Sequence, residues 1–107
     1  MKVVGVWHIT EMEMWDEDYF NMERQAYIQI GQDGLGEFQF GLVSGQIDGE
    51  VIETEEGERF EFTWDGSDEL DPVSGSGWLR SVGEKVGEGH IKIHMGDASL
   101  FKVKKVQ

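Results

Sequence analysis

The sequence predicts an all-β domain of antiparallel strands, and three observations support this. Short apolar runs alternate with polar residues at the period of a strand, and about eight such runs recur at roughly 8–12-residue spacing. The chain has 15 Gly and a single Pro, a composition typical of many tight turns. No helical pattern is long enough for the crossover that parallel strands need. With 107 residues, we expect one domain covering residues 1–107.

The individual elements follow from the alternation of residue types along the chain. The clearest strand holds Phe60, Phe62 and Trp64, which alternate with polar residues and should therefore face a core. Acidic residues lead the segment 15–22, which favours a short helical turn. The expected strands are residues 3–13, 26–30, 35–47, 51–54, 59–65, 78–82, 89–95 and 99–106.

Glycine marks the expected turns and one expected irregularity. The pairs Asp33-Gly34 and Asp48-Gly49 are typical of hairpin turns. The phase of the apolar residues changes near Gly41, which we interpret as a bulge or a bend in the strand. The longest loop is expected at residues 66–77, which are rich in Gly, Ser and acidic residues.

A closed barrel is favoured, and a β-sandwich is the alternative with the same strand pattern. Closure is the better solution for a small sheet because it removes the unpaired edges. In such a barrel the last strand pairs with the first. Lys102 and Lys104 would then lie beside Glu11 and Glu13 on the outer face, where opposite charges pair favourably.

Two resemblances to known families add to this interpretation. The opening Gly5-Val6-Trp7 resembles the Gly-X-Trp start of the lipocalins and related calycins, which implies a small barrel with Trp7 closing one end. Residues 5–16, 60–72 and 89–97 resemble a family of small bacterial proteins of unknown function. That second resemblance implies a domain type and brings no activity with it.

Composition narrows the classes of partner and the compartment. The net charge of -13 argues against nucleic acid and against anionic membrane surfaces, which both attract Lys and Arg. Residues 1–71 carry 19 acids and 3 bases, so the negative charge is concentrated there. The chain has no Cys, no signal-peptide pattern and no long apolar run. We therefore expect a cytoplasmic protein without a disulfide or a cofactor.

Four carboxylates follow one another after the clearest strand. Asp65, Asp68, Glu69 and Asp71 offer the hard oxygen ligands that Ca²⁺ and Mg²⁺ prefer. Their spacing differs from that of an EF-hand loop. The sequence therefore leaves two interpretations open, a metal site and a solvated turn.

A catalytic set is harder to find in this sequence. His94 and Asp97 come together across a predicted turn, where an imidazole and a carboxylate form an acid/base pair in principle. No Ser or Cys stands in the context of a nucleophile. An enzyme that uses His94 and Asp97 is therefore the least favoured interpretation.

The aromatic residues carry the leading functional hypothesis. Trp64 continues a core face, whereas Trp15 and Trp78 flank predicted loops and, with Tyr19, are the candidates for a ligand contact. The leading interpretation is a non-enzymatic binding module for a small apolar ligand or a protein partner. The alternative is an acidic inhibitor-type or immunity-type protein that binds a basic target. A homodimer is compatible with either interpretation.

Overall fold

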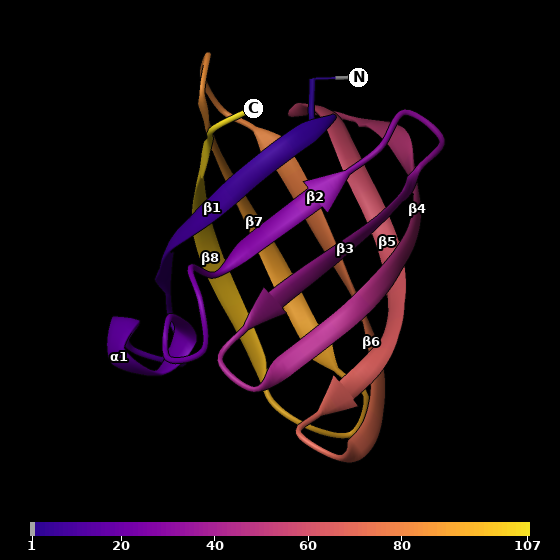
Figure 1. Cartoon of the computed structure of the whole chain (residues 1–107). Helices are drawn as coiled ribbons and strands as arrows, with labels where there is room; N and C mark the ends of the chain where they lie inside the picture. The colour runs from indigo at the N-terminus through magenta and orange to yellow at the C-terminus, as the bar shows by residue number, and fades with distance from the viewer. Residues whose placement is uncertain (1) are drawn as a thin grey trace.

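The structure is a computed structural model that describes residues 2–107, and these residues form eight strands and one short helix (Figure 1). In chain order, the elements are β1 (Gly5–Met12), α1 (Glu17–Phe20), β2 (Tyr27–Ile30), β3 (Leu35–Phe40), β4 (Val43–Thr54), β5 (Gly57–Asp68), β6 (Asp71–Ser81), β7 (Val86–Ile93) and β8 (Ala98–Lys105). The helical turn expected at 15–22 is therefore present as α1.

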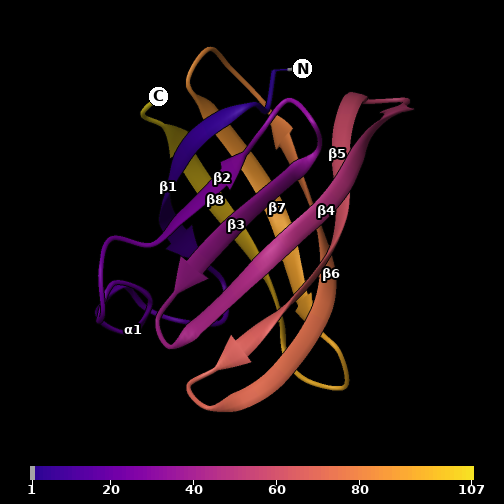
Figure 2. The same ribbon diagram turned by 45° about the vertical axis from the view of Figure 1, so that its right-hand side comes forward.

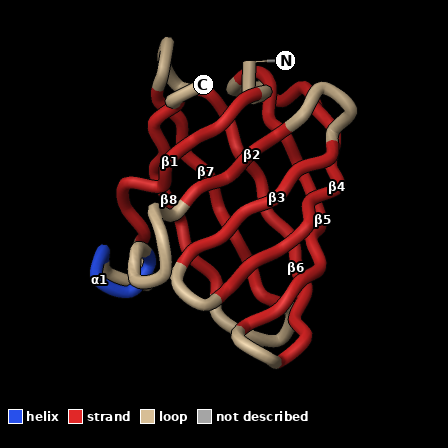
Figure 3. The backbone as a smooth tube through the Cα atoms, viewed as in Figure 1, coloured by secondary structure: helices blue, strands red, loops and turns tan. Residues whose placement is uncertain are grey.

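Every strand pairs antiparallel with the next, and β8 returns to pair with β1, so the sheet closes into a barrel (Figures 2 and 3). The predicted small antiparallel barrel is thereby confirmed, and the sandwich alternative is excluded. Lys102 lies opposite Glu11, with 3.6 Å between Nζ and Oε2, as expected. Lys104 lies opposite His8 instead of beside Glu13, because β1 and β8 run antiparallel and the residue that reaches Glu13 is Leu100.

The segment 35–47, expected as one strand with a bulge or a bend near Gly41, is two strands, so the prediction of a single strand is wrong. The chain reverses at Gly41, whose φ of 57° is a conformation that glycine adopts without steric cost. The turn expected at Asp48-Gly49 is also wrong, because β4 continues through both residues. Gly49 faces the interior, where a Cβ would come 2.7 Å from Phe60 Cζ.

The long loop expected at 66–77 does not exist, which is a further correction. Strand β5 continues to Asp68 and β6 begins at Asp71, so only Glu69 and Leu70 separate the two strands. Trp78 consequently lies inside β6 and does not flank a loop. The Gly and Ser residues that suggested a loop occupy paired strand positions on both sides of this hairpin.

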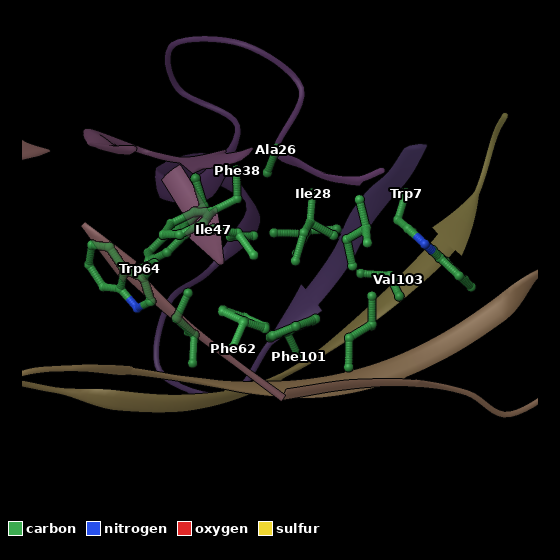
Figure 4. Packing of buried hydrophobic residues seen from close by; sticks show 14 of the residues in the cluster. Trp7, Ala26, Ile28, Phe38, Ile47, Phe62, Trp64, Phe101 and Val103 are labelled. Carbon is green, nitrogen blue, oxygen red and sulfur yellow. The ribbon is translucent and has the colours of Figure 1, made fainter. Parts of the chain in front are cut away.

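Side chains fill the interior of the barrel (Figure 4). The rings of four phenylalanines lie directly over glycines of neighbouring strands, where a Cβ would come within 2.4–2.7 Å of a ring carbon. These pairs are Gly45 with Phe38, Gly49 with Phe60, Gly77 with Phe62 and Gly89 with Phe101. Trp64 is 3% exposed and belongs to this core, as predicted. Many of the 15 glycines thus make room for aromatic rings.

Trp7 is completely buried in the same core and is anchored by a hydrogen bond. Its Nε1 donates to the carbonyl oxygen of Val3 at 2.8 Å, and Lys105 Nζ lies 5.5 Å from the ring centroid. A buried indole needs such an acceptor, and here a residue just before β1 provides it.

Candidate functional site

Trp78 is a large aromatic side chain on the outer surface of the barrel wall. Side chains in β6 alternate between the core and the outer surface. Leu79 faces the core and is completely buried, whereas the adjacent Trp78 faces outward and is half-buried. The strand register places Glu61 of β5 on one side of Trp78 and His90 of β7 on the other. The indole therefore lies in the middle of an outward-facing sheet surface.

Two arginines approach the Trp78 ring from the same end of the strands. The Cζ atoms of Arg59 and Arg80 lie 5.1 Å and 5.9 Å from the ring centroid, within cation–π range. Each guanidinium is also held by carboxylates, Arg59 by Glu61 and Arg80 by Glu56 and Glu88. These ion pairs fix the arginines and leave the ring in a defined position.

Beyond the other side of Trp78, the surface is hollowed into a groove of about 560 Å³ that we call the Trp78 groove. Gly49 and Gly77 line it with their backbone, since a Cβ at either position would point into the core toward Phe60 and Phe62. The other lining side chains that matter here come from four neighbouring strands. They are Asp48, Glu50, Glu61, Thr63, Trp78 and His90.

The charge distribution in the Trp78 groove is unusual for a sheet surface. Glu50 of β4 lies directly opposite Glu61 of β5, and like charges in this arrangement destabilise a sheet. Arg59 neutralises Glu61. Asp48 and Glu50 form no ion pair with any side chain of residues 2–107. One wall of the groove is therefore anionic, and the other is aromatic.

A second, smaller hollow of about 230 Å³ lies on the β8 side of Trp78. Trp78 and the half-exposed Leu100 give it an apolar surface, and Glu11, Glu13 and Glu88 stand around it. Two of these acids are already paired, Glu11 with Lys102 and Glu88 with Arg80. Trp78 thus lines both hollows and separates them.

Trp15 and Tyr19, the other two predicted ligand contacts, lie together at one end of the barrel. Their ring centroids are 6.0 Å apart, and Trp15 also lies 5.0 Å from the buried ring of Phe40. The Leu42 N–H donates to the Tyr19 hydroxyl at 3.5 Å. Asp16 caps α1 by accepting from Tyr19 N–H at 3.1 Å, which holds this aromatic pair over the core.

The four carboxylates proposed for a metal are spread along the β5–β6 hairpin. Asp65 and Asp68 belong to β5, Glu69 to the turn and Asp71 to β6. Asp68 and Asp71 are partners in the strand register, whereas Asp65 lies opposite Ser74. Across residues 2–107, no three His, Asp or Glu side chains are placed to hold a metal ion.

His94 and Asp97 both lie in the exposed turn between β7 and β8. Within the described part of the chain, no hydrogen bond or ion pair joins the two side chains. The turn is instead closed through the backbone, where Ile93 N–H donates to the Asp97 carbonyl at 2.9 Å. The geometry does not assemble the acid/base pair that the sequence suggested.

A polar cluster on β2 and β3 was not predicted from the sequence. The Tyr27 hydroxyl donates to Glu37 Oε2 at 2.5 Å, and Arg24 Cζ lies 4.7 Å from the Tyr27 ring centroid. Burial and the contact with Glu37 raise the pKa of Tyr27 above its usual 10.0, while Arg24 opposes the shift. Tyr27 and Glu37 come together because β2 pairs with β3, and the register of that pair could not be known from the sequence.

Comparison of the chain with protein-family models, with curated proteins and with solved structures finds no match. The lipocalin-like opening and the likeness to a bacterial family therefore stay predictions. No helix within residues 2–107 has the length and apolar character that a membrane crossing requires. The interpretation of the candidate site is therefore based on its geometry alone.

Proposed function

We propose that this chain is a non-enzymatic binding module that recognises a protein partner through the outer barrel surface around Trp78. The observation that carries the proposal is an indole on an outward position, fixed by two paired arginines and shared by two hollows. Tryptophan is one of the residue types enriched among the few that dominate the binding energy of an interface.

The packed interior favours a partner on the outside over a small apolar ligand enclosed in the barrel. Ligand-binding barrels need an open interior, whereas here the rings of Phe38, Phe60 and Phe62 lie so close to glycines of neighbouring strands that a Cβ there would come within 2.7 Å of a ring carbon. The small apolar ligand remains the rival proposal, and the second hollow beside Leu100 is the place where it fits best. We place the binding in the cytoplasm, a reducing compartment that suits a chain without cysteine.

The acidic inhibitor-type role is a second candidate, and a different observation favours it. The hairpin of β4 and β5 carries a high density of acids at and near its tip, including Glu53, Glu55 and Glu58. Binding through this hairpin would depend on long-range attraction and would weaken uniformly as salt rises. Binding through Trp78 would retain a contribution that salt does not screen.

The proposal is tested by comparing wild type, Trp78→Ala and Glu53→Gln/Glu55→Gln as baits for proteins of the source cell, with thermal unfolding of each variant as the folding control. We expect Trp78→Ala to fold and to lose a specific captured protein that the hairpin variant retains. Capture that survives Trp78→Ala but is lost in the hairpin variant would replace the proposal with the acidic inhibitor-type role.

A further inference from the structure

We infer that the Trp78 groove receives an arginine or lysine side chain from a basic, extended segment of a protein partner. This inference rests on the proposed function and adds the chemistry of the partner to it. The groove offers a carboxylate wall, an aromatic wall and a polar floor, which together match a cation on a flexible stem better than an anion or a hydrocarbon.

The dimensions of the groove suit such a side chain. Asp48 and Glu50 stand on β4, and Trp78 stands on β6, with β5 between them. Two strand spacings separate the walls by about 10 Å. Glu61 stands between Glu50 and Trp78 in register, so the place for a guanidinium or an ammonium group is toward Asp48 and Thr63. Thr63 of β5 lies on the floor and offers a hydroxyl to a donor on the incoming group.

The electrostatics of the empty groove favour a cation from outside the chain. Asp48 and Glu50 have no ion-pair partner among residues 2–107, and Glu50 faces Glu61 in register. Arg59 already pairs with Glu61, so the charges that a cation from outside would neutralise are those of Asp48 and Glu50. The carboxylates would also accept charge-assisted hydrogen bonds from it, which are stronger than neutral ones.

The nearby arginines do not oppose this occupant. Arg59 and Arg80 lie beside the Trp78 ring at the end away from Thr63, since Arg59 precedes Glu61 and the register runs antiparallel. Both are neutralised by glutamates. Trp78 also lines the groove, so an incoming cation can approach its ring there.

The charge of the whole chain favours a basic polypeptide as the source of this cation. Residues 1–71 hold 19 of the 22 acids, and β4 and β5 form the acidic side of the barrel. Such a field steers a polycation toward the wall that contains the groove. A segment lying along the groove would bring further basic residues near Glu53 and Glu58.

The test is a titration of amide-labelled protein with a hexa-arginine peptide, followed by nuclear magnetic resonance. We expect the largest shifts at residues 48–50, 61–63 and 76–78, and a dissociation constant that weakens with salt. The Asp48→Asn/Glu50→Gln variant should bind at least about tenfold more weakly, since charge-assisted hydrogen bonds are lost.

The matched control is Glu23→Gln/Glu84→Gln, which removes the same charge from exposed residues outside the groove. It should weaken binding less than about twofold, because only the long-range attraction changes. Equal weakening in both double variants would overturn the inference, as would shifts spread over the whole acidic surface. Equally tight binding of free spermine would replace the partner segment with a small polyamine.

Self-association provides a further readout. A wild-type dimer that dissociates in Asp48→Asn/Glu50→Gln would identify a second copy of this chain as the occupant and would overturn the inference. Loss of the captured protein in Trp78→Ala combined with no binding of the arginine peptide would overturn the cation inference alone. Retained capture in Trp78→Ala would instead remove the proposed function on which the inference rests.

Discussion

Replacing Gly45 with alanine tests whether the barrel interior is full. Gly45 lies on β4 under two rings that meet edge to face, those of Phe38 and Trp64, whose centroids are 5.0 Å apart. A Cβ at Gly45 would stand 2.7 Å from Phe38 Cε2 and 2.7 Å from Trp64 Cε3. Both rings are nearly completely buried, so the new methyl group can be accommodated only by displacing them.

The magnitude follows from two opposing effects. Forcing an extra methyl group into a packed core costs about 1–3 kcal/mol. Alanine also reduces the freedom of the unfolded chain, which stabilises the fold by about 0.4–1 kcal/mol where the backbone conformation allows it. The net expectation is a loss of about 1–2 kcal/mol in the free energy of unfolding. For a domain of this size, that loss lowers the Tm by about 4–8 °C.

The assay is thermal and urea unfolding of Gly45→Ala beside the control Gly96→Ala. A Cβ at Gly96 would meet only Ile93, at 3.2 Å or more, so this variant should stay within about 0.5 kcal/mol of wild type. Adding Phe38→Leu to Gly45→Ala makes room for the methyl group. The double variant should therefore be less unstable than the sum of the two single changes.

Equal stability of Gly45→Ala and Gly96→Ala would refute the reasoning. It would mean that the rings of Phe38 and Trp64 move without cost and that the interior has spare volume. A small apolar ligand inside the barrel would then regain the advantage over a partner on the outer surface. The experiment thus tests whether the interior is filled and, through that, whether a ligand inside the barrel or a partner on its outer surface is favoured.

Three further predictions follow from the aromatic residues. Trp15→Ala should lose about 2 kcal/mol of unfolding free energy, since Trp15 packs on the core, whereas Trp78→Ala should lose less than about 1 kcal/mol in urea unfolding. The reverse order would make Trp78 structural. The pKa of Tyr27 is higher in the folded than in the unfolded state. The protonated Tyr27 therefore contributes its full stabilisation below pH 10.0, and this contribution is lost as the pH rises through the folded-state pKa. Tyr27→Phe should remove this loss in unfolding measured across alkaline pH, and an unchanged pH profile would contradict the contact with Glu37.

Alternation along the chain was sufficient to predict the strands whose inner face carries large side chains. In β5, Phe60, Phe62 and Trp64 occupy every second position and are all buried. Closure could also be argued from charge, since Lys102 does face Glu11. The expected pairing of Lys104 with Glu13 was wrong because, in an antiparallel pair with Lys102 opposite Glu11, Lys104 lies nearer the start of β1, opposite His8.

The wrong boundaries have one physical origin, which is that glycine serves two purposes in this chain. Gly41 turns the chain because it adopts positive φ, whereas Gly49 and Gly77 leave space for the rings of Phe60 and Phe62. The sequence shows glycine in both cases. Only the neighbouring strands reveal which purpose applies, and their register was unknown.

Only part of the candidate site could be predicted, again because the strand register was unknown. Trp78 could be recognised as a candidate from its residue type, but its surroundings come from three other strands. Glu50 and Glu61 become neighbours only when β4 and β5 are known to form one continuous hairpin. A turn placed at Asp48-Gly49 separated the two glutamates and concealed the anionic wall.

A barrel with a filled interior limits where recognition can evolve, because every inward position is constrained by its neighbours. Outward positions are free of that constraint, so a residue pair there that lowers stability calls for another explanation. Glu50 opposite Glu61 is such a pair, because Arg59 compensates only Glu61 and leaves Glu50 without an ion-pair partner among residues 2–107, and Glu61 lies beside Trp78 of β6. If a cation occupies the Trp78 groove in the complex, Glu50→Gln should raise the Tm of the free protein and weaken binding of the arginine peptide. Stability and binding would then change in opposite directions, which a purely structural role for Glu50 does not predict.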